Sequence, residues 1–275
     1  MLPVPAPSVS ICIPVDLAEP YLGESIRSVL DQTYRDFELV VLDNASPDRA
    51  DVLARKVGDV RIRVERNTAP VHRGENWNRA VQLTRAPLVK LLRPTDLLHP
   101  RCLELQVGPM EADPGLAVVA ARRHMVDELS RVVVPRRGLS GLTGVRTGVE
   151  VARRVVRSRS NPIGEPGSVL FRRDDFFAAG GWRADRTFTM DLDLWMRLLQ
   201  FGEFLGLPEP LAAFRSIRGT STPEARQALA AEQQLLIEEI VDTEAFAVRG
   251  LDVTLGRLFA PSGRAKRRAM LSAAQ

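Results

Sequence analysis

The first hundred residues alternate between short apolar runs and longer segments whose apolar residues recur at helical spacing. The runs VSICIPV (9–15) and FELVVLD (37–43) have the length and composition of strands buried on both faces. Between them, apolar residues at Leu22, Ile26 and Val29 would line one face of a helix. Because such alternation is typical of βαβ units, we predict an α/β fold with a mainly parallel sheet flanked by helices.

The alternation continues through the first two hundred or so residues. Residues 135–165 are rich in Arg, Gly and Ser and show little periodicity, so we expect a long irregular excursion there. From residue 223 the pattern is helical, and the chain ends in the basic segment GRAKRRAMLSAAQ. Further strands are predicted over 61–67, 87–92, 116–128, 168–172 and 209–216, with helices over 50–57, 76–86, 98–114, 173–179 and 190–200.

Composition limits the classes of protein to which the chain can belong. With 275 residues, 45% of them hydrophobic, it can bury the core of one large domain with an appendage. A net charge of +4 and 5% aromatic residues argue against a dedicated nucleic-acid interface. Cys12 and Cys102 offer neither a disulfide framework nor a metal cluster. Without a recognisable signal peptide or membrane span, a cytoplasmic protein is expected.

Three polar corners follow predicted strands, and all three should lie at one edge of the sheet. They are Pro14–Asp16, Asp43–Ser46 and Arg93–Asp96. In open α/β sheets, ligands bind beyond the carboxyl ends of the strands. We therefore expect a binding site where these corners meet.

An ordered set of motifs resembles family 2 glycosyltransferases, the inverting nucleotide-sugar enzymes of the GT-A fold. The matching segments are VSICIPV, FELVVLDNASPD, NWNRAVQLTRAPLVKLLRPTDLLHP, GEPGSVLFRRD, GGW, DLDLWMRL and EPLAAFRS. The resemblance implies a Rossmann-like GT-A domain over 1–222, with a nucleotide-binding half (1–100) and an acceptor-binding half (101–222). Residues 223–275 would form a helical C-terminal extension. The implied donor is a nucleotide-diphosphate sugar, and the acceptor is a hydroxyl on a glycan, a lipid-linked molecule or a secondary metabolite.

The nucleotide side of the site is implied by position. The resemblance places Pro14, Val15 and Asp16 in the loop that holds the nucleotide, and Asp43 where a carboxylate contacts its base. The alternative for Asp43 is to cap the following helix, together with Asn44 and Ser46. Arg73 lies where the family offers a basic residue to the nucleotide, and a solvated helix start is the alternative for Arg73 and His72.

The acceptor side is implied in the same way. Asp191 matches the carboxylate that serves as general base for the acceptor hydroxyl, and it would also provide favourable charge at a helix N-terminus. Asp193 is expected to be structural. The resemblance places Glu165 and Arg172 near the acceptor, although a surface role is the alternative for Arg172 or Arg173.

The motif that normally binds a metal and the diphosphate is altered. Thr95 and Asp96 occupy the usual Asp-Asp pair, Arg93 replaces an earlier aspartate, and Ile217 replaces a histidine at the end of the last strand. Mg²⁺ or Mn²⁺ prefers charged oxygen ligands, so metal use is in doubt. Two alternatives follow for Arg93. It would either take the place of the metal cation and bind the diphosphate, or form an ion pair with Asp96 or Asp43 and leave the site closed and inactive.

Two functions follow from these alternatives: an inverting sugar transferase, or a degenerate GT-A domain that binds a nucleotide, a glycan or a partner protein without catalysis. The basic C-terminal segment leaves open a peripheral contact with an anionic membrane, which would place the protein at the inner membrane face. A homodimer is also left open. The arginine-rich composition favours a bacterial source of high GC content.

Overall fold

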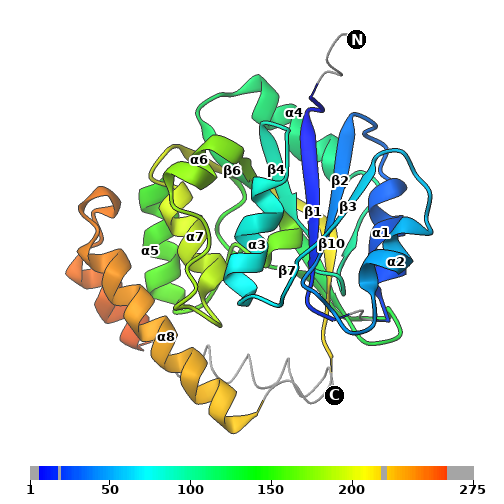
Figure 1. The fold of residues 1–275 in the computed structure, drawn as a ribbon. Helices are drawn as coiled ribbons and strands as arrows, with labels where there is room; N and C mark the ends of the chain where they lie inside the picture. Colours follow the sequence, from blue (N-terminus) through cyan, green and yellow to red (C-terminus); the bar gives the residue numbers. More distant parts are fainter. Residues whose placement is uncertain (1–5, 18–19, 218–221, 259–275) are drawn as a thin grey trace.

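One mixed sheet organises the part of the chain that the structure, a computed structural model, describes: residues 6–17, 20–217 and 222–258 (Figure 1). The strands lie in the order β3-β2-β1-β4-β9-β6-β10-β5, while β7 pairs with β6 and β8 pairs with β10. Their bounds are β1 Val9–Val15, β2 Phe37–Asp43, β3 Ile62–Arg66, β4 Leu88–Leu91, β5 Leu97–Leu98, β6 Leu116–Val126, β7 Val132–Arg137, β8 Gly144–Arg146, β9 Val169–Arg172 and β10 Glu203–Arg215.

The parallel prediction holds for the first half of the sheet. Strands β3, β2, β1 and β4 are parallel neighbours, and β6 is parallel to β10. Strand β9 differs, because it runs antiparallel to both β4 and β6 and so separates two parallel groups. The corners after β1, β2 and β4 therefore lie at one edge, as the sequence predicted.

Helices cover both faces of the sheet because alternate strand residues point in opposite directions. In β1, Cys12 belongs to one apolar cluster, while Ile11 and Ile13 belong to the other. The Cys12 face packs against α3 (Arg73–Gln82), α5 (Gly148–Ser158), α6 (Arg173–Ala178) and α7 (Met190–Leu198). The opposite face packs against α1 (Leu22–Leu30), α2 (Ala50–Arg55) and α4 (Cys102–Ala112).

Residues 135–165 are ordered structure, which corrects the expectation of an irregular excursion. They contain the end of β7, strand β8 and the eleven-residue helix α5. Thr147 begins α5 with a capping box: its hydroxyl accepts from the Glu150 N–H, and the Glu150 carboxylate accepts from the Thr147 N–H. The buried residues of α5 recur at helical spacing: Val151, Ala152, Val155 and Val156. Interleaved arginines concealed this pattern in the sequence.

The predicted C-terminal helix is α8 (Pro223–Asp242), capped by Thr222, and residues 250–258 are helical as well. Leu236, Ile237 and Ile240 bury the second half of α8 in the same apolar cluster as α5 and α7. No helix within the described ranges is long and apolar enough to cross a membrane. The basic segment 263–275 lies outside the described residues.

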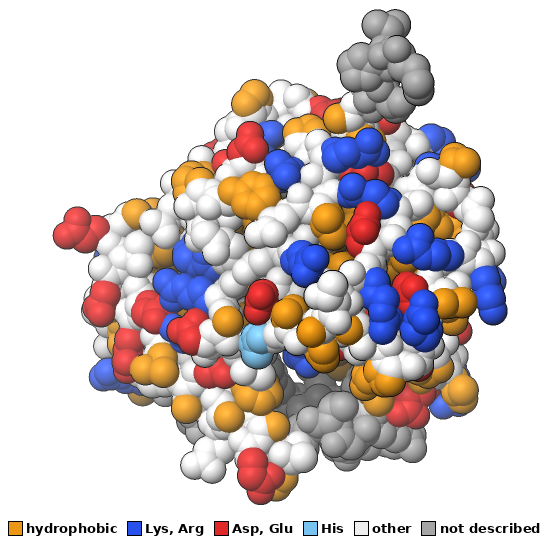
Figure 2. All heavy atoms as spheres, in the orientation of Figure 1, with side chains coloured by type: hydrophobic (Ala, Val, Ile, Leu, Met, Phe, Trp, Pro, Cys, Tyr) orange, Lys and Arg blue, Asp and Glu red, His pale blue; other side chains and the backbone are white. Residues whose placement is uncertain are grey.

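Charged side chains of both signs are interspersed over the face drawn in Figure 2. On this face, arginine and lysine side chains lie among acidic and apolar ones rather than forming one continuous basic surface.

Candidate active site

A cavity of about 1060 Å³ opens at the carboxyl ends of β1 and β4 and extends toward α5, α7 and α8. Most of the residues that the sequence nominated line it: Pro14, Asp16, Arg73, Arg93, Thr95, Glu165 and Asp191. The cavity thus joins the nucleotide corner to the proposed base. Asp96 lies behind Arg93, and the other three nominated residues, Val15, Asp43 and Arg172, do not line the cavity.

Asp16 is held in place by a network of amides. Its Oδ1 accepts from Asn44 Nδ2 at 2.9 Å and from Asn76 Nδ2 at 3.3 Å, while Arg73 Nε lies 3.9 Å from Oδ2. Asn67 joins the two amides, because its Nδ2 donates to the side-chain oxygens of both Asn44 and Asn76. Asp16 and its partners come from four segments of chain, so the network was not visible in the sequence.

Asp43 is fully buried and takes the capping role that the sequence left as its alternative. Its carboxylate accepts from the Ser46 N–H at 2.7 Å and the Asp51 N–H at 3.3 Å, and it pairs with Arg66. It fixes the turn between β2 and α2 and leaves no carboxylate edge toward the cavity. Val15 is likewise buried, with its side chain in the apolar core beneath the site.

Arg93 and Asp96 form the closest contact at the altered metal motif. Arg93 Nε and Nη2 donate to the two oxygens of Asp96 at 2.9 and 2.7 Å, in fork geometry. Asp96 Oδ1 also accepts from the Thr95 hydroxyl and from the Arg215 N–H. The guanidinium of Arg93 stacks on Phe214 at 4.1 Å, and 28% of its side chain stays exposed.

This corner does not fit a carboxylate-held metal. A divalent cation needs several oxygen ligands, and both oxygens of Asp96 already accept from donors. A cation there would also lie beside the permanent charge of Arg93. Within the described ranges, no group of three or more His, Cys, Asp or Glu side chains could hold a metal ion.

Arg215, at the end of β10, braces the same corner. It is fully buried; its Nε donates to the Thr95 carbonyl at 3.0 Å, and its Nη2 pairs with Glu24 at 2.8 Å. Nη1 donates to Ser130 Oγ at 2.9 Å. The sequence placed Arg215 beside a missing histidine but did not reveal this role.

Asp191 is the second residue of α7, and it faces the cavity. Its Oδ1 is buried, and the indole N–H of Trp182 acts on the carboxyl as a hydrogen-bond donor that lowers its pKa. Burial raises the pKa of Asp191 to about 7, and the negative charge of Glu165 adds to the effect. Attraction to Arg93 opposes these two effects. A carboxyl with this pKa can accept a proton near neutral pH.

Glu165 lies on the cavity wall, paired with the buried Arg123 of β6. Burial alone would raise the pKa of Glu165, but the charges of Arg123 and Arg137 outweigh it and hold that pKa at about 2. Glu165 therefore remains ionised and acts on Asp191 as a fixed negative charge. Arg123 lies in β6 between Arg122 and His124, and nothing local in the sequence marked it as the partner of Glu165.

The acceptor-side placement of Arg172 is corrected by the structure. Its guanidinium donates to the carbonyls of Met110, Asp113 and Leu116 at 2.8–2.9 Å, so it closes the end of α4 instead of facing the cavity. His72 is the N-cap of α3 through its ring nitrogen.

From the sequence we expected acceptor specificity in residues 135–165 and the C-terminal helices, but the sequence did not single out the residues at the far end of the cavity. Arg137 at the end of β7, Arg154 of α5 and Arg159 at the C-cap of α5 line this end, and α8 contributes Leu229 and Gln233. These segments had the weakest sequence pattern. The high arginine content of residues 135–165 was the sequence feature that indicated a basic lining there.

A mixed sheet covered by helices on both faces, with a cavity beyond the carboxyl ends of its parallel strands, is the arrangement expected of a GT-A fold. Residues 10–177 match the model of the family described as Glycosyl transferase family 2, and the chain belongs to this family. It is a glycosyltransferase. Asp191 lies beyond the matched range, as does all of α8.

Two known proteins are similar to most of the chain. An uncharacterized protein of Mycobacterium tuberculosis is 28% identical over 86% of this chain and 76% of its own length. The putative glycosyltransferase EpsE of Bacillus subtilis is 27% identical over 71% of this chain and 68% of its own.

Two solved structures share the fold. S. aureus TarS 1–349 in complex with UDP-GlcNAc superposes with a TM-score of 0.64 at 15% identity, covering 86% of this chain and 72% of TarS 1–349. The Pyrobaculum calidifontis mannosyltransferase PcManGT, in complex with GDP-Man and Mn²⁺, gives a TM-score of 0.61 at 15% identity, covering 98% and 86%.

Proposed function

We propose that the chain transfers a sugar from a nucleotide-diphosphate sugar to a hydroxyl acceptor with inversion at the anomeric carbon, and that Asp191 is the general base. The observation that carries this proposal is Asp191 itself: a carboxylate that lines the cavity at the start of α7 and has a pKa of about 7. The acceptor oxygen attacks the anomeric carbon opposite the diphosphate and gives its proton to Asp191. The bond from that carbon to the diphosphate oxygen breaks, and the nucleoside diphosphate leaves.

The charge of the leaving diphosphate would be met by arginine. Arg93 and Arg73 line the nucleotide end of the cavity, and the pair with Asp96 fixes the orientation of the Arg93 guanidinium. A preoriented guanidinium requires little reorganisation as negative charge develops. Calorimetry with UDP-, dTDP- and GDP-sugars tests this part. We expect the same affinity with EDTA as with Mn²⁺, whereas binding that disappears in EDTA would contradict it.

The acceptor end of the cavity favours an acceptor that carries negative charge. Arg137, Arg154 and Arg159 line this end, and Glu165 is already paired with Arg123. Arg154→Gln is expected to raise the KM for a phosphate-bearing acceptor and to leave the donor Kd unchanged.

The test of the whole proposal is Asp191→Asn. Asn keeps the shape of the side chain but cannot take the proton, so we expect turnover to fall by about a hundredfold or more with donor affinity intact. NMR of the product of the wild-type enzyme should show the anomeric configuration opposite to that of the donor. Unchanged turnover in Asp191→Asn, or retained configuration, would rule the mechanism out.

A further inference from the structure

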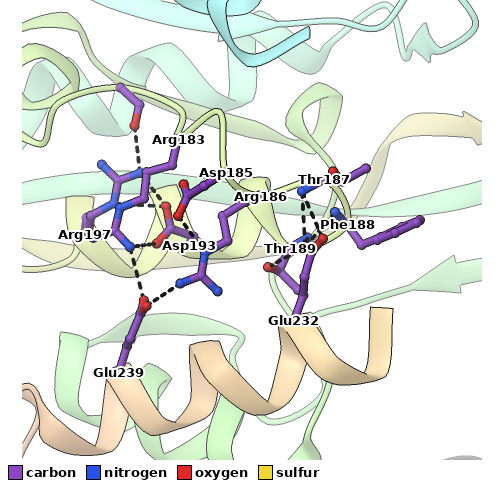
Figure 3. A network of polar contacts seen from close by, with 11 residues as sticks. Arg183, Asp185, Arg186, Thr187, Phe188, Thr189, Asp193, Arg197, Glu232 and Glu239 are labelled. Atoms are coloured by element: carbon purple, nitrogen blue, oxygen red, sulfur yellow. Dashed lines mark hydrogen bonds and ion pairs between the residues drawn. The ribbon is translucent and has the colours of Figure 1, made fainter. Parts of the chain in front are cut away.

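The C-terminal helix α8 makes direct contact with the loop that leads into Asp191. In Figure 3, Glu232 of α8 points at the backbone of Thr187, Phe188 and Thr189. Its carboxylate accepts from these three consecutive N–H groups at 3.2, 2.9 and 3.1 Å, and also from the Thr189 hydroxyl at 3.2 Å. Three successive N–H groups converging on one carboxylate form an anion-binding nest. Asp191 follows only two residues after the last of them.

This contact replaces the usual local cap of α7. Thr189 is the N-cap residue, but its side chain makes no capping hydrogen bond within α7. The four first N–H groups of a helix, and those just before it, need partners from elsewhere when they are shielded from water. Here a carboxylate more than forty residues later in the chain satisfies the N–H groups just before α7.

A second carboxylate of α8 reinforces the first. Glu239 lies seven residues after Glu232, so both project from one face of the helix, together with the buried Leu236. Glu239 pairs with Arg186 and lies 3.2 Å from Arg183 (Figure 3).

Arg183 contacts both α8 and α7. The same guanidinium lies 3.3 Å from Asp193, which also pairs with Arg197 at 2.6 Å. Helix α8 therefore contacts the Asp191 segment on both sides: the loop before it through Glu232, and the helix after it through Arg183 and Asp193.

We propose that Glu232 is a positioning residue for the general base, and that α8 is part of the acceptor site of this enzyme. By fixing Thr187–Thr189, Glu232 sets the direction in which the Asp191 carboxylate enters the cavity. The same helix contributes Leu229, Ala230 and Gln233 to the cavity wall. The proposal rests on the proposed function, since it needs Asp191 to be the base.

The test compares Glu232→Ala with Glu238→Ala on the same helix. Glu238 is exposed, and its hydrogen bond comes from Gln234 of α8 itself, so it is a matched control. The first measurement is the titration of the Asp191 carboxyl carbon by NMR, assigned with Asp191→Asn. The groups that act on this carboxyl are Glu165, Arg93, Arg73 and Trp182, and Glu232→Ala leaves all of them in place.

We expect the Asp191 midpoint to move in Glu232→Ala from about 7 toward the ordinary value, because a loosened loop admits water to the carboxylate. The second measurement is the hydrolysis of the donor, with water as the acceptor, followed by the release of the nucleoside diphosphate. The donor is whichever UDP-, dTDP- or GDP-sugar binds most tightly in calorimetry. The rate of hydrolysis should fall by about ten- to a hundredfold, the scale set by a displacement of about 1 Å, with donor Kd unchanged. Glu232→Gln, which keeps one acceptor oxygen, should lie between Glu232→Ala and the wild type, and Glu238→Ala should match the wild type.

A wild-type midpoint for Asp191 in Glu232→Ala would overturn the positioning role, and so would equal losses in Glu238→Ala. These outcomes differ from a failure of the proposed function itself. If Asp191→Asn keeps its turnover, the base is wrong whatever Glu232 does. If Asp191→Asn is inactive while Glu232→Ala behaves as wild type, only the role of Glu232 fails.

Discussion

Asp191 is a single residue whose proposed role lowers the stability of the folded chain. In the folded chain its pKa is raised to about 7, so between its ordinary pKa and that value the folded state holds a proton that the unfolded state has lost. Above pH 7 the ionised carboxylate is buried at a free-energy cost. We therefore expect Asp191→Asn to raise the thermal midpoint at pH 8. The gain should shrink as the pH falls below about 7 and vanish below the ordinary pKa of an aspartate, where Asp191 is protonated in both the folded and the unfolded chain. Calorimetric scans at several pH values measure it, and an equal effect at every pH would contradict it.

The same pKa predicts the pH dependence of turnover. Below about pH 7 the Asp191 carboxyl is protonated and cannot accept the acceptor's proton. The acid limb of kcat/KM should therefore fall by about tenfold per pH unit below a midpoint near 7. Removing the charge of Glu165 with Glu165→Gln should shift that midpoint downward, since this charge raises the pKa of Asp191. A midpoint near 4 in the wild type would contradict the raised pKa of Asp191.

Arg93 and Asp96 depend on each other for stability. Asp96 is 2% exposed, and Arg93→Ala would leave its carboxylate without its charged partner. Breaking a buried pair from one side typically costs about 3–5 kcal/mol, and the partial exposure of Arg93 places the expected loss at or below about 3 kcal/mol. Removing both side chains with Arg93→Ala/Asp96→Ala should restore part of the loss. Urea unfolding of the two single variants and the double variant measures the coupling, and simple additivity would show that the pair contributes no interaction energy.

At the scale of elements, helix α5 depends on the cap that its sequence encodes. Thr147→Ala removes one side of the capping box and should cost about 1 kcal/mol. Denaturant unfolding measures the loss. Thr254→Ala, in which an exposed hydroxyl donates only to the carbonyl one turn earlier, is the control and should change stability by less than about 0.5 kcal/mol.

Elements with strong local pattern were predictable, and those defined by distant contacts were not. The strands at 9–15 and 37–43 have the predicted bounds because β-branched apolar runs flanked by turn residues carry their own signal. Helix α5 was missed because Arg153, Arg154 and Arg157 interrupt its apolar stripe. The direction of β9 could not be predicted, since a short apolar run reads alike in parallel and antiparallel pairs.

The candidate site also contains residues that could be predicted from local sequence motifs and residues that could not. Asp191, Arg93 and Thr95 were found because they lie in motifs that can be read along the chain. The partners that decide their chemistry, among them Arg123, Arg215 and Glu232, come from segments far away in sequence. Position along a strand does not reveal whether a carboxylate faces the cavity, which is why Asp43 was nominated and proved to be a cap.

At the scale of the whole molecule, the two faces of the sheet are built from different parts of the chain. The face with α1, α2 and α4 is complete by β10, whereas the opposite face takes Leu236, Ile237 and Phe246 from beyond it. A chain ending at Thr222 should therefore expose this apolar surface. We expect a lower thermal midpoint and increased binding of a hydrophobic dye compared with the full chain. A shortened chain with unchanged midpoint would show that the extension is not part of the core.

The contact between Glu232 and the loop before Asp191 also has a consequence for biosynthesis. A nascent chain leaves the ribosome from its N-terminus, so the nucleotide corner can fold while α8 is still being translated. Until residue 232 has emerged, the three N–H groups before α7 lack the carboxylate that holds them. The segment that carries Asp191 would therefore be among the last parts of the site to be fixed.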